Sequence, residues 1–207
     1  MDLLNLIIDF AIVMLILIPS SIIHEVAHGY MAELLGDSTA RYAGRLTLDP
    51  RSHVDPWGTL LMPFILYMAS GGSFMFAYAK PVPYNPYNLK NHRWGPALVG
   101  FAGPAVNFLL ALMVGLVIRF FVGFDAVGLV LARVVELNLV LMVFNLVPIP
   151  PLDGSKILYA LLPDSAHAIK NFLDRYGYII LIIFIFTLFR LISPLIFWLF
   201  NLIVGGG

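Results

Sequence analysis

Long apolar segments separated by short polar stretches are the dominant pattern of this chain. The aliphatic and aromatic positions gather in runs of about 20 residues or more, the length that a helix needs to cross the hydrocarbon core of a bilayer. These runs occupy residues 3–35, 94–122, 126–147 and 178–204. Proline is expected to bend or interrupt three of them, at Pro19, at Gly103-Pro104 and at Ser193-Pro194. The pattern therefore predicts an all-α polytopic membrane protein with about four transmembrane helices.

The region between the first two of these helices has a different pattern. Residues 57–67 are apolar, Gly71-Gly72 breaks the run, and residues 74–79 have the aromatic content typical of a strand. Further along the chain, the prolines between 148 and 151 end the third helix sharply, because proline cannot continue it. Residues 155–175 are then expected to form an amphipathic helix at the membrane interface.

The composition agrees with a membrane protein. Of the 207 residues, 60% are hydrophobic and 12% are charged, whereas soluble domains contain about 25% charged residues. We therefore expect one integral-membrane domain, 1–207. The first apolar run follows Asp2 without a basic stretch, so we interpret it as a membrane helix and not as a cleaved signal peptide. The chain has no cysteine, which leaves His, Asp and Glu to bind a metal, and its net charge of zero gives no reason to expect a nucleic-acid partner.

The arrangement of residues 57–79 decides the topology, and two arrangements are open. If this region crosses the membrane once, His28 and Asp153 lie at opposite ends of the membrane; if it enters and returns as a re-entrant hairpin, they lie at similar depth on parallel helices. With the hairpin, most Lys and Arg residues share one side and only Arg119 and Arg133 lie opposite, whereas a single crossing splits them almost evenly. The positive-inside rule therefore favours the hairpin, with the N-terminus outside and the basic loops cytoplasmic.

The candidate chemistry is concentrated in His24-Glu25-Val26-Ala27-His28, inside the first apolar run. At a spacing of four, two imidazoles project from one helix face, one turn apart, and can share a metal ion. Glu25 lies beside the first of them, where a carboxylate can accept a proton from a metal-bound water. This motif also arises by chance, but a group that needs water is costly in a lipid-facing segment, so its position indicates function.

Asp153 is the best candidate for a third metal ligand. It ends an apolar helix after a proline-rich turn, and Gly154 behind it allows a close approach of backbone. Two imidazoles and one carboxylate leave a fourth tetrahedral position for water, as in catalytic zinc sites. The alternative is an ordinary Asp-Gly turn, which would be the better interpretation in a soluble protein. The membrane context and the histidine motif favour the ligand.

Three segments together resemble the core motifs of the site-2 protease family, the intramembrane zinc metalloproteases. They are the motif at 24–28, Gly103-Pro104-Ala105-Val106-Asn107, and the run Asn145-Leu146-Val147-Pro148-Ile149-Pro150-Pro151-Leu152-Asp153-Gly154. The resemblance covers nearly the whole chain, with the motifs in the family's order. The chain carries no inserted PDZ or CBS domain, and in this it resembles the compact prokaryotic branch of the family.

The resemblance implies a metalloendopeptidase in which His24, His28 and Asp153 bind one Zn²⁺ and Glu25 is the catalytic acid and base. It implies hydrolysis of peptide bonds in transmembrane protein or peptide substrates by zinc-activated water, without a covalent intermediate. With the charge argument, it predicts a multi-pass protein of the cell membrane, embedded in the lipid bilayer, with its active site nearer the cytoplasmic side. The strand expected at 74–79 would pair with an unwound substrate by edge addition.

Two amides and one further histidine are weaker candidates. Asn145 and Asn107 lie in otherwise apolar helices and are suited to donating to an oxyanion or to positioning the substrate backbone. Alternatively they form hydrogen bonds between helices, usually worth under about 2 kcal/mol. His53, between Asp49 and Asp55, is either a solvated loop residue or an additional or inhibitory ligand.

Two other functions compete with proteolysis. A catalytically silent member of the family would bind membrane substrates without cleaving them, but loss of the carboxylate at Glu25 would then be expected. A metal or ion transporter would spread acidic and histidine residues over several depths of the membrane, whereas here they concentrate at one depth, apart from Glu136.

Overall fold

The membrane-spanning part of the structure consists of long apolar helices. The computed structural model describes residues 2–163 and 165–205. Within these residues, three helices are long and apolar enough to cross a membrane, namely α1 (Leu3–Leu34), α4 (Gly95–Val117, continued by a π-helical turn to Val122) and α5 (Ala126–Asn145). A fourth span results if His167–Thr187 and Arg190–Val204, which meet at 67°, form one broken helix. The predicted all-α class with about four spans is thus confirmed.

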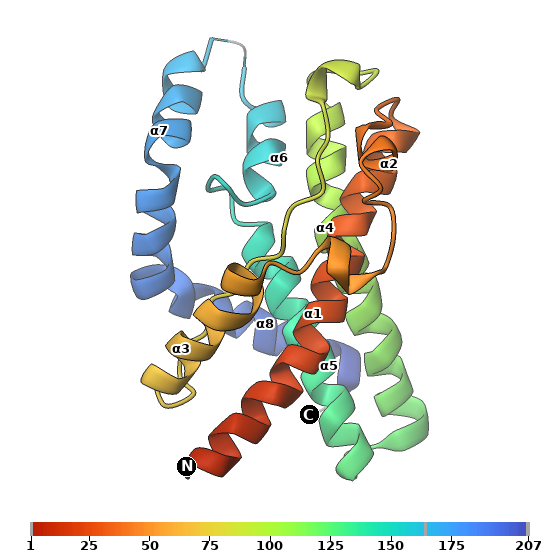
Figure 1. Ribbon diagram of the computed structural model, residues 1–207, viewed down its shortest axis with the longest axis vertical. Helices are drawn as coiled ribbons and strands as arrows, with labels where there is room; N and C mark the ends of the chain where they lie inside the picture. The colour runs from red at the N-terminus through yellow and green to blue at the C-terminus, as the bar shows by residue number, and fades with distance from the viewer. Residues whose placement is uncertain (1, 164, 206–207) are drawn as a thin grey trace.

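The helices run alternately up and down in Figure 1. α1 leads from the N-terminus to the short α2 (Thr39–Tyr42) at the upper end, α4 returns to the lower end, and α5 rises beside it. α6 (Gly154–Leu161) continues upward, α7 (His167–Ile183) descends, and α8 (Phe189–Val204) packs across α4 and α5. A buried apolar cluster joins α4, α5 and α8. It consists of Ala111, Ile118, Val135, Leu139, Val143, Ile196, Ile203 and Val204.

One predicted proline effect is not found, because α4 continues through Gly103-Pro104, where an interruption was expected. Pro19 and Pro194, where bends were predicted, also lie inside helices that continue through them. A proline inside a helix removes one backbone hydrogen bond, but Pro104 is fully buried against neighbouring helices, which offset that loss. The bend in the last segment instead follows the π-helical turn Phe184–Leu188.

The predicted interfacial helix at 155–175 is also wrong in its extent. The structure has two helices there, because α6 ends before Pro163 and α7 begins at His167. Leu162 has the extended conformation that a residue before proline prefers. The two helices lie side by side, with the Tyr159 hydroxyl donating to Asp174 at 2.6 Å.

Residues 57–79 form the predicted hairpin. A π-helical turn (Pro56–Leu61) and α3 (Met62–Ala69) lead downward in Figure 1, Gly71 and Gly72 turn the chain with positive φ, and an extended segment returns upward. The limbs are joined by hydrogen bonds from Tyr78 N to Gly58 O at 3.1 Å and from Thr59 Oγ1 to Tyr78 O at 2.8 Å.

The strand expected at residues 74–79 is not formed, although the backbone there is extended. A strand needs a second extended segment beside it, and the described residues contain none. The backbone groups bond instead to the loop before α3, as when Lys80 N donates to His53 O at 2.8 Å. The aromatic content of residues 74–79 thus reflects contact with apolar helices and not membership of a sheet.

Asp37 fastens the end of α1 to the loop that precedes α4. It is fully buried and accepts hydrogen bonds from Thr39, from Asn88 Nδ2 at 2.8 Å and from the backbone of Asn85 at 2.6 Å. Burial by itself would raise the pKa of this carboxyl, but these hydrogen bonds outweigh it and lower the pKa below the ordinary value of 3.8. The loop therefore depends on an ionised carboxylate.

We expect the hydrogen bonds between Asp37 and this loop to be lost in acid. Because the folded-state pKa of Asp37 is lowered, its contribution to stability is complete above about pH 4 and disappears as the pH falls below that value. Asp37→Asn turns a donor toward the Asn85 N–H and should cost about 2 kcal/mol at neutral pH. Thermal unfolding in detergent between pH 3 and 7 measures both effects. An Asp37→Asn variant that unfolds at the wild-type temperature at pH 7 would contradict the predicted cost of the substitution.

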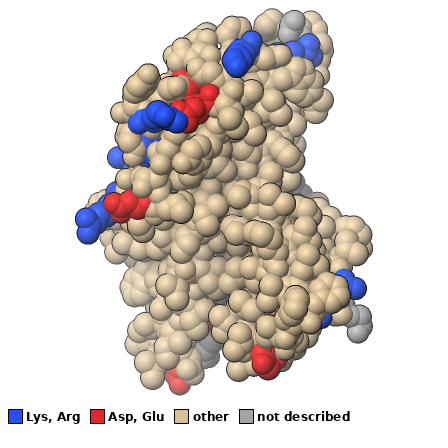
Figure 2. Space-filling view, turned by 90° about the vertical axis from the view of Figure 1, so that its right-hand side faces the viewer, with Lys and Arg blue, Asp and Glu red and all other residues tan. Residues whose placement is uncertain are grey.

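Basic side chains are unevenly distributed along the length of the molecule. On the face drawn in Figure 2, most Lys and Arg side chains lie over the upper half, the end that carries α2 and α6 in Figure 1. This distribution agrees with the predicted gathering of basic loops on one side of the membrane.

Candidate metal centre

α1 presents two imidazoles on one face, one turn apart. His24 and His28 are buried, with 6% and 7% of their surfaces exposed. One possible ligand atom from each of His24, Glu25 and His28 lies within 4.8 Å of the others. The motif identified in the sequence therefore forms a compact cluster that could hold a metal ion.

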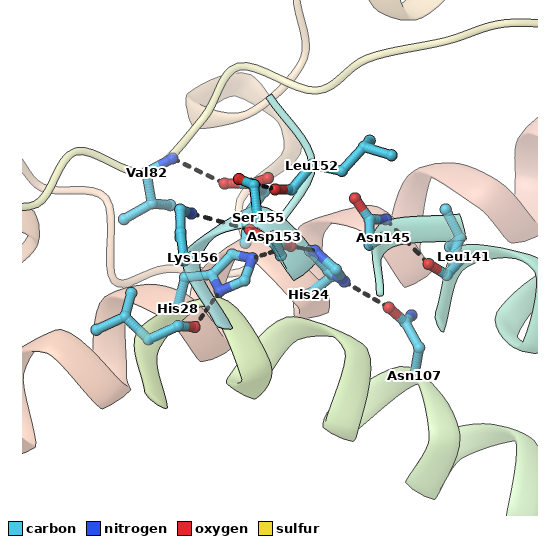
Figure 3. Close-up of polar contacts among 12 residues, drawn as sticks. His24, His28, Val82, Asn107, Leu141, Asn145, Leu152, Asp153, Ser155 and Lys156 are labelled. Atoms are coloured by element: carbon cyan, nitrogen blue, oxygen red, sulfur yellow. Dashed lines mark hydrogen bonds and ion pairs between the residues drawn. The ribbon is translucent and has the colours of Figure 1, made fainter. Parts of the chain in front are cut away.

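The turn between α5 and α6 brings Asp153 to the same cluster. Asp153 directly precedes α6, and its Oδ2 lies 3.1 Å from His24 Nε2 and 3.1 Å from His28 Nε2. Figure 3 shows both rings turned toward this carboxylate. The three residues that the sequence proposed as ligands thus meet at one point, as the hairpin topology requires.

The other nitrogen of each ring is fixed by an acceptor. His28 Nδ1 lies 2.6 Å from the backbone carbonyl of Val99, and His24 Nδ1 lies 2.5 Å from Asn107 Oδ1. A carbonyl oxygen only accepts, so each Nδ1 carries the ring proton and donates it. Both Nε2 atoms therefore direct a lone pair toward Asp153 Oδ2, and a cation is the partner that satisfies all three atoms.

Glycines of α4 leave the space around these rings. A Cβ added at Gly103 would lie 2.5 Å from His24 Nε2 and 2.6 Å from His28 Cε1, and a Cβ at Gly100 would lie 3.0 Å from the Asp153 carbonyl. Real Cβ atoms essentially never approach other atoms to less than 3.0 Å. Gly103, from the second motif of the resemblance, is thus the residue that allows α4 to pack against the histidines.

A charged side chain and a backbone strap complete the surroundings. Lys156 Nζ donates to Asp153 Oδ1 at 2.9 Å and lies 5.5 Å from the centre of the Tyr84 ring. Glu25 is half-buried, and its Oε2 accepts the Val82 N–H at 2.8 Å. The chain between Val82 and Tyr84 therefore lies against both the lysine and the glutamate; Figure 3 shows Val82 and Lys156 beside Asp153.

The two amides proposed from the sequence have different surroundings. Asn107 is fully buried and lies at the Nδ1 edge of His24, and its amide group donates to Asn138 Oδ1 at 2.8 Å. Asn145 is half-buried at the end of α5, and its amide donates back to Leu141 O at 2.9 Å (Figure 3). Asn107 thus contacts a proposed ligand directly, whereas Asn145 lies at the border of the site.

Asn138 is a residue that the sequence analysis missed. It is fully buried on α5 and connects Asn107 with Ser20 of α1. An amide in an apolar helix is a signal in itself, but its partners lie 31 and 118 positions away in the chain. Only the packing of the helices shows what it contacts.

His53 is not solvated. It is fully buried, and its Nε2 lies 2.8 Å from the Thr47 carbonyl. It lines a small cavity together with residues of α1 and the extended segment, among them Met14, Ile18, Ser21 and Ala77. The interpretation as a solvated loop residue is wrong, and the described contacts do not include the cluster around Asp153.

The donor set fits zinc. Zinc prefers imidazole nitrogen and carboxylate oxygen ligands in a tetrahedron, and ligand atoms about 2.0–2.1 Å from the ion are then roughly 3.3 Å apart. The separations of 3.1 Å between the two Nε2 atoms and Oδ2 are close to this value. His24, His28 and Asp153 would hold the ion, while Asn107, the Val99 carbonyl and Lys156 orient them.

Curated proteins from several organisms are similar to this chain. It is 38% identical over 183 residues to "Putative zinc metalloprotease YwhC" of Bacillus subtilis (strain 168), covering 83% of this chain and 78% of that protein. It is 32% identical over 191 residues to "Putative zinc metalloprotease Rip2" of Mycobacterium tuberculosis (strain H37Rv), covering 87% and 69%. A "Zinc metalloprotease MJ0392" of Methanocaldococcus jannaschii is 26% identical over 172 residues, covering 83% and 40%.

Comparison with protein families gives the same result. Peptidase family M50 matches residues 10–137 and 125–189, which contain the histidine motif, Gly103 and Asp153. No solved structure matches the chain. The sequence match extends over most of the chain and includes every residue of the metal centre, so the chain belongs to peptidase family M50, the site-2 protease family of zinc metalloproteases.

Proposed function

We propose that this protein is an intramembrane endopeptidase that binds one zinc ion and hydrolyses peptide bonds of membrane-embedded substrates. The observation that carries the proposal is the convergence of two histidine lone pairs on one oxygen of Asp153, beside Glu25, in a bundle of membrane-spanning helices. A site with this donor set leaves one position open for water.

Glu25 is the residue that moves protons in this proposal. A zinc ion, when bound, lowers the pKa of water and polarises a carbonyl. The Glu25 carboxylate accepts the proton of the attacking water and delivers it to the leaving amine. Its contact with the Val82 N–H holds one oxygen in place, which leaves the other oxygen to face the water.

The two amides take different roles. The Asn107 amide is engaged with Asn138 and with the Ser20 carbonyl, and its oxygen is engaged with His24, so we assign it to orienting this ligand and not to an oxyanion contact. Asn145, at the border of the site, retains the role of contacting the substrate backbone.

The extended segment is suited to receiving an unwound substrate. The backbone N–H groups of Tyr78 and Lys80 face the loop before α3, so by the alternation of an extended chain those of residues 77 and 79 face the opposite way. An apolar cavity of 280 Å³ borders this segment, lined among others by Leu17, Met75, Ala77, Leu137 and Leu141. A substrate lying here would bond to free backbone groups while its side chains contact α1 and α5.

The site is placed nearer the cytoplasm in this proposal. The metal centre lies at the level where α6 begins, and α6 leads to the end of the molecule over which most Lys and Arg side chains lie on the face drawn in Figure 2. The positive-inside rule assigns that end to the cytoplasm.

Removal of the third ligand tests the proposal. Asp153→Ala should lose bound zinc and with it the cleavage of tagged transmembrane substrates in liposomes, because two imidazoles alone bind zinc weakly. The matched control is Asp174→Ala, which removes a carboxylate that bonds to Tyr159 on the same pair of helices. Zinc is measured by elemental analysis and cleavage by gel. A wild type without zinc, or an Asp153→Ala variant that still cleaves, would overturn the proposal.

A further inference from the structure

We infer that Asn138 is a positioning residue for the metal centre, which acts through Asn107 to fix the ring of His24. The inference rests on the proposed role of His24 as a ligand. It concerns three helices, because Ser20 lies on α1, Asn107 on α4 and Asn138 on α5.

A continuous series of hydrogen bonds leads from α5 to His24. Asn138 Nδ2 donates to the Val134 carbonyl at 2.9 Å and to Ser20 Oγ at 3.0 Å. Asn138 Oδ1 accepts from Asn107 Nδ2 at 2.8 Å, and Asn107 Oδ1 lies 2.5 Å from His24 Nδ1. Both asparagines are fully buried, so no water competes for these groups.

The Val134 carbonyl determines which group of each amide in this series donates and which accepts. A carbonyl only accepts, so Asn138 must turn its amide group toward Val134, and its oxygen then faces Asn107. Asn107 must in turn present its amide group to Asn138 and its oxygen to His24. With the amide of Asn138 reversed, two oxygens would face each other at its contact with Val134.

This direction matters for the metal. Because the Asn107 oxygen faces Nδ1, the proton of His24 stays on Nδ1 and the lone pair of Nε2 points to Asp153. If Asn107 turned over, its amide group would oppose the Nδ1 proton and favour the tautomer that cannot bind the ion. A structural role requires only that these hydrogen bonds join the helices, whereas this role also requires that the Asn107 oxygen faces His24 Nδ1.

The test compares two positions on the same helix. Asn138→Leu keeps the branching of the side chain and removes its hydrogen bonds, and Leu139→Ala removes fully buried apolar atoms that lie in the cluster of α4, α5 and α8. In purified protein, we expect Asn138→Leu to weaken zinc binding about tenfold, as loss of such supporting contacts does. Leu139→Ala should lower the unfolding temperature and keep zinc affinity within about twofold of wild type.

A double variant separates orientation from structure. Asp at position 107 has two acceptor oxygens and needs no partner to orient it, so in Asn107→Asp the substitution Asn138→Leu should no longer weaken binding. We expect Asn107→Asp/Asn138→Leu to bind zinc within about threefold of wild type, and cobalt-loaded protein should regain the wild-type visible absorption bands. Ser20→Ala, a milder change that removes one acceptor of Asn138, should weaken zinc binding about threefold.

The outcomes are distinguishable. Zinc affinity is measured by competition with a chromophoric chelator. If wild type binds no zinc, the proposed metal centre itself fails. If wild type binds zinc and both Asn138→Leu and Ser20→Ala bind it equally well, or if the double variant is as weak as Asn138→Leu alone, Asn138 only joins helices and the inference is wrong.

Discussion

Glu25→Gln is expected to abolish peptide hydrolysis while the metal stays bound. Glutamine has the size of glutamate but cannot accept the proton of the attacking water, so turnover should fall by about 10³-fold or more. Its amide oxygen can still accept the Val82 N–H, which keeps the side chain and the extended segment in place. Cleavage of a transmembrane substrate in liposomes and the zinc content of the same sample measure the two effects.

The control for Glu25→Gln is a second glutamate of α1. Glu33 is paired with Arg41 at the end of the helix, and Glu33→Gln should cleave substrate at the wild-type rate. Wild-type cleavage by Glu25→Gln would remove Glu25 from the reaction. Loss of zinc from it would instead make Glu25 a ligand, which its closeness to both histidines would allow.

The cluster of His24, Glu25 and His28 could be predicted from the sequence because its residues are local. The spacing of His24 and His28 places them on one face of any helix. Asp153 required a topological argument, since it is 129 positions from His24, and the distribution of basic residues provided it. The resemblance to the site-2 protease family, which covers nearly the whole chain, then indicated that His24, His28 and Asp153 form one site.

The supporting contacts could not be predicted because they depend on packing. The sequence left Asn107 open between a contact to the oxyanion or substrate and hydrogen bonds between helices, and the packing of α4 against α1 places it at the Nδ1 edge of His24. His53 was interpreted as a solvated loop residue, yet the return of the hairpin covers it. Both results follow from contacts between segments far apart in the chain, which composition and periodicity do not encode.

Proline had opposite effects in different surroundings. Pro163 ends α6 at the upper end of the molecule, where the Arg93 guanidinium donates to the Ala160 carbonyl at 2.8 Å and to the Leu162 carbonyl at 3.4 Å. Pro104 and Pro194 lie inside helices that continue through them. In a bundle within the membrane, the alternative to a helix is an unsatisfied backbone, so a helix with one missing hydrogen bond remains the favoured structure. The general tendency of proline to interrupt helices does not distinguish a proline in the loops from one inside the bundle.

Gly103→Ala is expected to destroy the metal centre although it replaces none of the proposed metal ligands. The added Cβ would lie 2.5 Å from His24 Nε2 and 2.6 Å from His28 Cε1, at the edge of each ring that faces Asp153. Neither ring can turn away, because each Nδ1 is held by an acceptor on α4. The methyl group would therefore push α4 from α1 or occupy the space of the ion, and zinc affinity should fall by more than about 100-fold.

A second glycine of α4 provides the comparison. A Cβ at Gly115 would lie 2.3 Å from the side chain of Ile203 in α8, so Gly115→Ala is an equally crowded substitution in the same helix, but away from the metal centre. Gly115→Ala should lower the unfolding temperature, as overpacking does, and bind zinc as wild type does. If both variants bind zinc equally well, α4 yields at Gly103 and the fit of this helix against the histidines does not determine the site. If only Gly103→Ala loses zinc, Gly103 contributes to the site by leaving room for the ion, while Asn107 of the same motif orients His24.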